Sequence, residues 1–320
     1  MAPESSATFA CFGGTCRVLA SGGAAAAPVA DARRRLLEWH RRFSRFDRAS
    51  ELSRLNADPR EVVPVTATLA RLARAVVAAG ERTGGLVDGT LLPEIEAAGY
   101  RGDIRLPLPL PLTLRLAPAR KPAAGRADAA WRRFDVDLER SRIRRPPGLA
   151  LDSGGLAKGL FADLLAEELA SRASFAVECA GDVRVGGEAR RSRRVEVASP
   201  FRARPLHGFE LADGGVATSG IGRRSWLDDR GRPAHHLLDP STGRPAFTGV
   251  VQATAIAPTA LEAELRAKAA LLAGPADAAG WLPDGGLVVF DDGSHQLLEP
   301  PSANGRESLH RGAGDRPRTA

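Results

Sequence analysis

The most informative stretch for the fold of this chain is Leu151-Asp152-Ser153-Gly154-Gly155-Leu156-Ala157-Lys158-Gly159. A short apolar strand is predicted at Leu149 to Leu151, and a helix with an apolar stripe is predicted to include Leu160 to Leu169. A glycine-rich turn ahead of a helix directs backbone N–H groups and the positive end of the helix dipole to one place, where Lys158 adds a full charge. The stretch therefore predicts a phosphate-accepting turn. It is neither a Rossmann nor a Walker motif, however, and an ordinary tight turn fits it equally well.

Helix and strand patterns alternate on both sides of this turn. Apolar residues recur at helical spacing over Pro28–Phe43 and Leu69–Gly80, and Thr83-Gly84-Gly85 ends the second pattern. A further helix is predicted at Thr259–Ala273. Strands are predicted at Arg133–Leu138, Arg142–Arg144, Ser174–Cys179, Val183–Gly187, Arg194–Ala198, Val251–Ala257, Gly286–Phe290 and His295–Leu298. This mixture predicts an α/β fold of mixed α+β character.

The length and composition predict one main domain. With 320 residues and 43% apolar content the chain can fill a large core, and we expect a single domain over residues 1–300. Residues 101–128 are rich in Pro and Arg, which predicts an irregular excursion on the surface. Residues 302–320 contain Gly, Pro and Arg without periodicity, and this composition predicts a disordered tail.

Charge and composition exclude several classes of function. The formal net charge is +7 and the pI about 10.2, but the arginines are scattered and aromatic residues make up only 5% of the chain, so no nucleic-acid surface is expected. No apolar run approaches the roughly 18 residues that a membrane span needs. Residues 1–10 lack the basic and apolar regions of a secretory signal, so we expect a cytoplasmic protein.

A second polar cluster lies in the C-terminal half. Ala217-Thr218-Ser219-Gly220 is followed, after a charged stretch, by His235-His236-Leu237-Leu238-Asp239-Pro240-Ser241-Thr242-Gly243. The Asp-Pro-Ser-Thr-Gly segment is typical of a turn, because proline fixes the backbone there. A histidine beside this turn is able to take a proton from an incoming hydroxyl, since imidazole titrates near neutral pH. A histidine that only stabilises the turn fits the same pattern.

Taken together, these segments resemble the FAD:protein FMN transferase (ApbE-like) family in order and spacing. Phe12-Gly13-Gly14-Thr15 is similar to the family's opening Met-Gly-Thr, with Gly13 in the place of Met, and Gly84 to Thr90 is similar to its Gly-Ala-Phe-Asp-x-Thr. Leu151 to Gly159 is similar to Leu-Asp-Leu-Gly-Gly-Ile-Ala-Lys-Gly. Further matches lie at 43–46, 50–56, 177–183, 216–220, 236–245 and 257–260. Each motif is weak alone, and their shared order makes the resemblance specific.

The resemblance implies a T-fold-like core with an additional α/β portion, which together enclose a cleft for FAD. His236 would serve the transfer step, Phe46 would lie beside the flavin or adenine, and Lys158 would lie near the phosphates. The full set of FAD-binding residues that the resemblance implies is Gly13, Phe46, Leu86, Val87, Asp88, Asp152, Lys158, Thr218 and Leu237.

The resemblance also implies magnesium at the FAD pyrophosphate, and here the chain departs from the family. The family's ligands are an Asp and a Thr or Ser four residues apart on a helix, with a backbone carbonyl from the helix after the glycine loop. The matching residues are Glu264, Lys268 and, for the carbonyl, Phe161. Either Glu264 and Lys268 form an exposed helical ion pair, or the Lys268 ammonium supplies the charge of the metal, alone or with a weaker metal on Glu264.

The activity that the resemblance implies is cleavage of FAD and attachment of FMN to a Thr or Ser of a partner protein, with release of AMP. The acceptor flavoprotein would carry a motif resembling Asp-x-x-Thr/Ser-Gly-Ala-Thr/Ser, and this chain has no convincing copy of it. Two alternatives stay open. One is a protein that binds FAD without transferring FMN, suggested by Gly13 and Lys268. The other is an FAD pyrophosphatase, in which water releases FMN and AMP.

Overall fold

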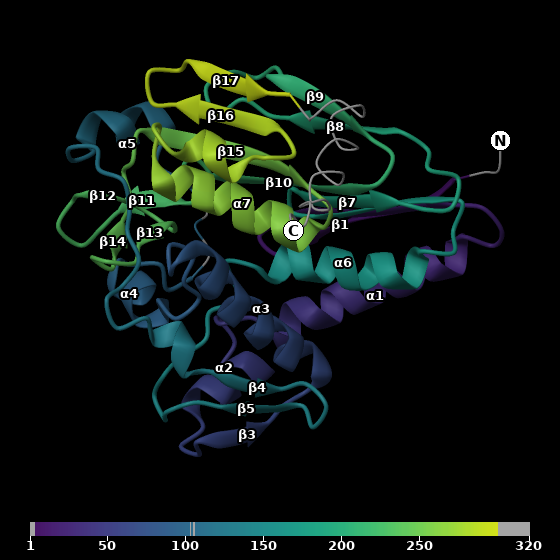
Figure 1. The fold of residues 1–320 in the computed structure, drawn as a ribbon, viewed down its shortest axis with the longest axis horizontal. Helices are drawn as coiled ribbons and strands as arrows, with labels where there is room; N and C mark the ends of the chain where they lie inside the picture. The colour runs from purple at the N-terminus through teal and green to yellow at the C-terminus, as the bar shows by residue number, and fades with distance from the viewer. Residues whose placement is uncertain (1–3, 103, 105, 300–320) are drawn as a thin grey trace, which may run out of the picture.

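One large antiparallel sheet forms the centre of the protein (Figure 1). The computed structural model describes residues 4–102, 104 and 106–299. Eight strands pair in the order β1-β2-β6-β7-β10-β15-β16-β17, and all neighbours are antiparallel. Their bounds are β1 Glu4–Cys11, β2 Gly14–Ser21, β6 Ser174–Cys179, β7 Asp182–Gly186, β10 Gly214–Gly220, β15 Val250–Ala257, β16 Gly286–Phe290 and β17 His295–Leu298.

Three helices cover one face of this sheet. Helix α1 (Ala26–Arg42) packs on β1 and β2, α6 (Ala157–Leu169) on β6 and β7, and α7 (Ala260–Ala273) on β10 and β15. Buried alanines line much of α7, and small side chains allow a helix to approach a sheet closely. The three helices and the sheet enclose the main hydrophobic core, so the predicted mixed α and β fold is confirmed.

The junction of α6 and α7 is unusually close. A Cβ atom built on Gly159 would lie 2.6 Å from the Ala260 carbonyl oxygen and 2.7 Å from the Leu261 Cα, so only glycine fits there without movement of the backbone. The Asp163 carboxylate accepts the Ala260 and Leu261 N–H groups at 2.9 Å each, and Thr259 caps the same helix end through the Glu262 N–H. These contacts fix the start of α7 against the first half of α6.

A smaller lobe lies beyond α3, on the side of the helices away from the large sheet (Figure 1). Its three-stranded sheet has the order β3-β5-β4 and is accompanied by α2 and α3. The lobe is joined to the glycine-rich stretch by Asn56, whose side-chain amide accepts the Leu151 N–H at 2.8 Å and donates to the Leu151 carbonyl at 2.9 Å. The bounds are α2 Glu51–Ala57, β3 Val62–Pro64, α3 Ala67–Thr83, β4 Asp135–Asp137 and β5 Arg142–Arg144.

Short elements connect these parts. Within the predicted excursion at 101–128, the residues that the structure describes are irregular apart from helix α5 (Leu110–Leu116). The predicted tail at 302–320 lies outside the described residues. No helix in the described part of the chain has the length and apolarity that a membrane span requires. The remaining elements are α4 Leu92–Ala97, η1 Ala130–Arg133, β8 Arg193–Val197, β9 His207–Leu211, β11 Ser225–Leu227, β12 Pro233–His235, β13 Leu238–Asp239, β14 Arg244–Pro245 and η2 Ala278–Trp281.

The strand predicted at Leu149 to Leu151 is wrong. This segment is irregular, because the Asn56 side chain provides both hydrogen bonds to Leu151 that a neighbouring strand would otherwise supply. The sequence also gave no prediction for β1 and β2. Alternate residues of β1 are half-buried and the others are exposed, so this edge strand has a weak apolar pattern.

His235, at the end of β12, is a buried part of the fold. Its ring is fully buried and meets Phe247 edge-on with 4.7 Å between ring centroids, and its Nδ1 accepts the Leu237 N–H at 3.3 Å. Burial lowers the pKa of His235 from the usual 6.5 to about 3. The neutral imidazole therefore belongs to the native state.

Gly159→Ala should destabilise the protein even though alanine favours helices. We expect the free energy of unfolding to fall by about 1–3 kcal/mol, because the added methyl overlaps the backbone of α7. Urea denaturation measures this loss. Gly280→Ala is the matched control, since a Cβ at Gly280 meets no atom within 4 Å, and it should change stability by less than about 0.5 kcal/mol. Equal effects of the two substitutions would contradict the close approach.

His235 should make the protein sensitive to acid. Between pH 6.5 and 3 the unfolded chain binds a proton at this residue and the native state does not, so stability falls as pH is lowered. At pH 5 this loss amounts to about 2 kcal/mol. His235→Gln should reduce the difference in unfolding free energy between pH 8 and pH 5 by about that amount. Substitution of the exposed His295 by Gln serves as the control, and a similar reduction there would count against the assignment.

Candidate functional site

Most of the predicted site residues line one pocket, which is bounded by the glycine loop, α6, α7 and loops from the N-terminal half. Thr218 and Glu264 instead line a groove that adjoins this pocket across the face of the large sheet. The predicted residues that line the pocket are Gly13, Phe46, Leu86, Val87, Asp88, Asp152, Lys158, Phe161, His236, Leu237 and Lys268. The structure therefore brings together residues that are more than 200 positions apart in the sequence.

The pocket and the groove meet at a set of polar side chains. Lys158, Arg224, His236 and Lys268 line both hollows. Any ligand that extends from one hollow to the other has to pass these four residues. Since three of them carry cationic groups, the junction favours an anionic part of a ligand.

Side-chain and backbone hydrogen bonds hold the glycine loop in place. The Asp152 N–H donates to the Gly89 carbonyl at 2.8 Å, and the Asp152 carboxylate accepts the Gly154 N–H at 3.1 Å. The Ser153 hydroxyl donates to the Phe43 carbonyl at 2.9 Å. The loop is thereby joined to two segments that also line the pocket, and α6 begins directly after it.

Lys158 is held by two buried carboxylates. Its ammonium makes an ion pair with Asp182 at the start of β7 and another with Glu264 Oε1 at 2.9 Å. The second oxygen of Glu264 accepts the Gly159 N–H at 2.9 Å. Side-chain exposure is 17% for Lys158, 1% for Asp182 and 2% for Glu264, so these charges are paired inside the protein. The sequence analysis assigned no role to Asp182, whose only signal was its place in the matched stretch 177–183.

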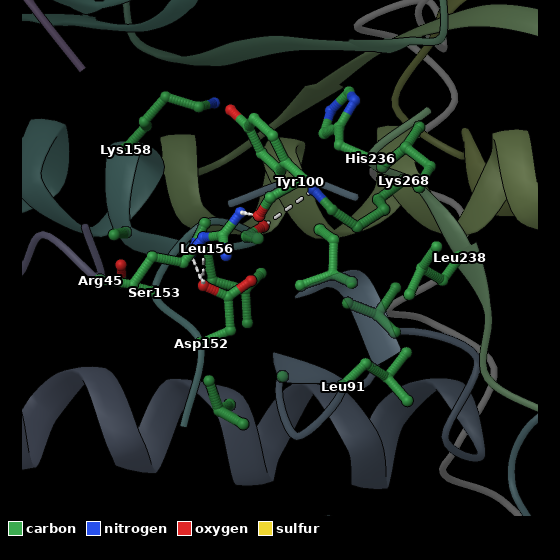
Figure 2. Close-up of a pocket in the computed structure, with 18 of the residues that line it drawn as sticks. Arg45, Leu91, Tyr100, Asp152, Ser153, Leu156, Lys158, His236, Leu238 and Lys268 are labelled. Atoms are coloured by element: carbon green, nitrogen blue, oxygen red, sulfur yellow. Dashed lines mark hydrogen bonds and ion pairs between the residues drawn. The ribbon is translucent and has the colours of Figure 1, made fainter. Parts of the chain in front are cut away.

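Of the two alternatives for Glu264 and Lys268, the structure rules out the exposed helical ion pair. Glu264 is buried and pairs with Lys158, while Lys268 donates to the Gly155 carbonyl at 2.9 Å. Figure 2 shows Lys158 and Lys268 extending into the pocket from opposite sides of the view, with a dashed line from Lys268 to a backbone oxygen. Both lysines therefore reach the pocket, and each has a different partner.

Burial and neighbouring charges shift the pKa values of Lys158, Glu264 and Lys268. Burial opposes the charge of Lys158, but Asp182 and Glu264 outweigh it and raise the pKa of Lys158 above its usual range. Burial also opposes ionisation of Glu264, and Lys158 and Lys268 lower its pKa in spite of this. For Lys268 burial is the largest effect and lowers the pKa. An anionic ligand beside Lys268 would favour its charged form.

An aromatic wall closes one side of the pocket. The Arg45 guanidinium lies 4.4 Å from the Phe46 ring centroid and 4.5 Å from that of Tyr100, and it donates to the Tyr100 carbonyl at 2.9 Å. Tyr100 stacks on Trp226 at 5.3 Å between centroids. Phe46 is 44% exposed, which leaves part of its ring free for contact with a planar ligand. Sequence reasoning named Phe46 and missed Arg45 and Tyr100.

Asp88 presents an acceptor at the inner end of the pocket. Its Oδ1 accepts the Thr90 N–H at 2.8 Å and the Thr90 hydroxyl at 2.6 Å, while its Oδ2 is buried with no hydrogen-bond partner in the described part of the chain. Burial raises the pKa of Asp88. An unpaired buried acceptor is costly, so this position favours a ligand that carries a hydrogen-bond donor.

His236 lies at the junction of pocket and groove. Its backbone N–H donates to the Arg224 carbonyl at 3.3 Å. Burial and, to a lesser extent, the Arg224 charge lower the pKa of His236 well below its usual value, so the ring is neutral at physiological pH. A neutral imidazole is able to accept a proton, and a nearby anionic ligand would raise its basicity.

The predicted metal residues do not fit a divalent ion. Phe161, whose backbone carbonyl was the predicted ligand, lies inside α6, where carbonyl oxygens accept the hydrogen bonds of the helix itself. Both Glu264 oxygens already have partners, and an ammonium at Lys268 cannot coordinate a cation. Among residues 4–102, 104 and 106–299, no group of three or more His, Cys, Asp or Glu side chains is placed to hold a metal ion.

The known proteins that this chain resembles belong to one family. The model of the ApbE family matches residues 12–289. The chain is similar to the FAD:protein FMN transferases of Salmonella typhimurium (28% identical over 237 residues, 71% of this chain and 65% of that protein) and Haemophilus influenzae (25% over 242 residues, 72% and 67%). The matched part thus spans about two thirds of these relatives' length.

A solved structure has the same fold over nearly its whole length. The ApbE protein of Thermotoga maritima has a TM-score of 0.76 and 25% identity, and the match covers 93% of this chain and 97% of that one. Since the family model also covers most of the sequence, the chain belongs to the ApbE family.

Proposed function

We propose that this protein is an FAD:protein FMN transferase, which cleaves FAD and attaches its FMN half to a Thr or Ser of a partner protein. One observation carries the proposal: His236 and Lys268 lie where the pocket meets the groove along the sheet, and they line both hollows. The pocket is suited to a flavin nucleotide, the junction to its pyrophosphate, and the groove to an incoming polypeptide.

The pocket supplies contacts for each part of FAD. The exposed part of the Phe46 ring offers a surface for a ring system, and Asp88 Oδ2 offers an acceptor for a ring N–H group. The glycine loop and the start of α6 face the place where the phosphates would lie. Gly13, Leu86, Val87, Asp152 and Leu237 complete this side of the proposed FAD site, and Thr218 lies on the groove side.

The reaction is a phosphoryl transfer in which His236 moves the proton. The acceptor hydroxyl oxygen forms a bond to the phosphorus of the FMN half, and the bond from that phosphorus to the bridging oxygen breaks. AMP leaves with the bridging oxygen and its electron pair. The neutral His236 ring accepts the hydroxyl proton, and Lys268 stabilises charge on the phosphates.

Two alternative functions use the same pocket. An FAD pyrophosphatase would use water in place of the acceptor hydroxyl, and an FAD-binding protein would not react at all. The acceptor motif Asp-x-x-Thr/Ser-Gly-Ala-Thr/Ser and the cytoplasmic location stay predictions. The groove favours transfer, because Thr218, Ser219 and His236 line one continuous hollow in which an acceptor segment would lie beside the imidazole.

Product identity tests the proposal. Purified protein is incubated with FAD, with and without a target protein that carries the acceptor motif. We expect a target whose mass increases by that of FMN less one water, together with free AMP. Free FMN and AMP without a modified target would support the pyrophosphatase, and unchanged FAD would support a binding protein.

His236→Ala should abolish most transfer and leave FAD binding intact. A group that moves a proton contributes about 10²–10⁴-fold to rate and little to binding of the substrate. The transfer rate and the FAD dissociation constant are measured separately. His235→Gln is the comparison, because His235 packs against Phe247 outside the pocket lining. A larger loss of transfer with His235→Gln would show that the roles are assigned to the wrong histidine.

The protein should bind FAD more tightly than FMN. The glycine loop and the cationic junction meet a pyrophosphate, which FMN lacks. Titration with each flavin, followed by fluorescence, gives the two dissociation constants. Equal affinities would mean that the junction does not contact the second phosphate.

A further inference from the structure

We propose that Lys268 receives the FAD pyrophosphate in place of a divalent metal ion, so that flavin binding in this protein needs no metal. The inference rests on the proposed function, because it assumes that FAD is the ligand of the pocket. It concerns four residues that pack together: Lys158 on α6, Asp182 on β7, and Glu264 and Lys268 on α7.

The Lys268 ammonium lies against the backbone of the glycine loop. It donates to the Gly155 carbonyl at 2.9 Å, and this is the acceptor found for it in the described part of the chain. An ammonium has three N–H donors, so two remain for a ligand. The side chain lines both the pocket and the groove, where the proposed pyrophosphate would lie.

The two buried carboxylates nearest Lys268 along this group are already paired with Lys158. Glu264 uses one oxygen for Lys158 and the other for the Gly159 N–H. Asp182 is paired with Lys158 as well. A divalent ion would have to displace Lys158 from both carboxylates and lie beside the charge of Lys268. These contacts favour the lysines over a metal ion.

The pairing of charges around the junction determines which cations are available to a pyrophosphate. Lys158 is paired with Asp182 and Glu264, and the Glu264 carboxylate alone offsets its charge, since burial raises the pKa of Asp182 to about 7. Lys268 has a neutral carbonyl as its partner, and Arg224 at the rim donates to the Phe12 carbonyl at 3.1 Å. Lys268 and Arg224 are therefore the cations whose charge is available to a pyrophosphate, while Lys158, Asp182 and Glu264 position the helices around it.

FAD binding with and without metal tests the proposal directly. The native protein is titrated with FAD in excess EDTA and in millimolar magnesium chloride, with riboflavin as the probe that has no phosphate. We expect the two FAD dissociation constants to agree within about twofold. An FAD affinity that falls tenfold or more in EDTA, with riboflavin binding unchanged, would overturn the proposal and leave the proposed function in place. A protein that binds no flavin in either condition would overturn both.

Lys268→Met removes the charge and should weaken FAD binding in EDTA by roughly 10- to 100-fold, as loss of charge-assisted hydrogen bonds does. Riboflavin binding should not change. Lys121→Met is the matched control, because Lys121 is exposed and lies outside the pocket lining, and it should leave both affinities as they were. Equal FAD affinities of the two variants would refute the role of Lys268. If Lys268→Met fails to fold, Lys268→Thr gives the same test.

A double variant that gives the site oxygen ligands for magnesium tests the proposal from the opposite direction. In Glu264→Asp combined with Lys268→Thr, the shorter carboxylate is drawn back from Lys158 and Gly159, and a hydroxyl replaces the ammonium. The variant thus offers two oxygen ligands of the kind that suits magnesium. FAD binding by this double variant should become at least tenfold tighter in magnesium than in EDTA. An affinity that is independent of magnesium in the double variant would contradict the view that the lysine takes the metal's place.

Discussion

The contact between α6 and α7 through Glu264 is the interaction on which the rest of the site depends. One buried carboxylate joins the Lys158 ammonium and the Gly159 N–H, at the place where a glycine lets the helices approach. A buried charge without these partners would be strongly destabilising, so the helices are held in this register. The same contact places Lys268, one turn further along α7, against the glycine loop.

The contact between α6 and α7 determines where the pocket and the groove lie. The glycine loop is fixed by Asn56 from the small lobe and by Ser153 on the Phe43 carbonyl, so the pocket lies between the lobe and the helices. The groove lies on the sheet, next to β10. His236 enters between them from the chain after β12. The pocket, which would bind the nucleotide, therefore meets the groove, which would admit the polypeptide, at the proposed reacting atoms.

The sequence predicts an element of the fold well where the signals for that element lie within a few neighbouring residues. The helix that ends before Gly84 and the helix that begins at Thr259 were predicted correctly, because a left-handed glycine and an N-capping hydroxyl are local signals. The pocket residues followed from family motifs. The irregular form of Leu149 to Leu151, where a strand was predicted, could not be foreseen in this way, since it depends on hydrogen bonds from Asn56, which lies 95 residues before Leu151.

The partners of Lys158 and Lys268 could not be read from spacing either. Glu264 and Lys268 are four residues apart on a helix, which favours a surface pair, yet burial of Glu264 against α6 gives it a different partner. Asp182 is remote in sequence and reaches Lys158 only because β7 packs on α6. Long-range packing, which a single sequence does not display, decides which charges meet.

The most direct test of this account is the rate of FMN transfer to an acceptor protein in the presence of a chelator. The native enzyme, freed of metal and assayed in excess EDTA, should modify the acceptor at a rate within a few-fold of the rate in magnesium. An enzyme that is inactive in EDTA and fully restored by magnesium would show that a metal ion, and not Lys268, supplies the charge at the pyrophosphate.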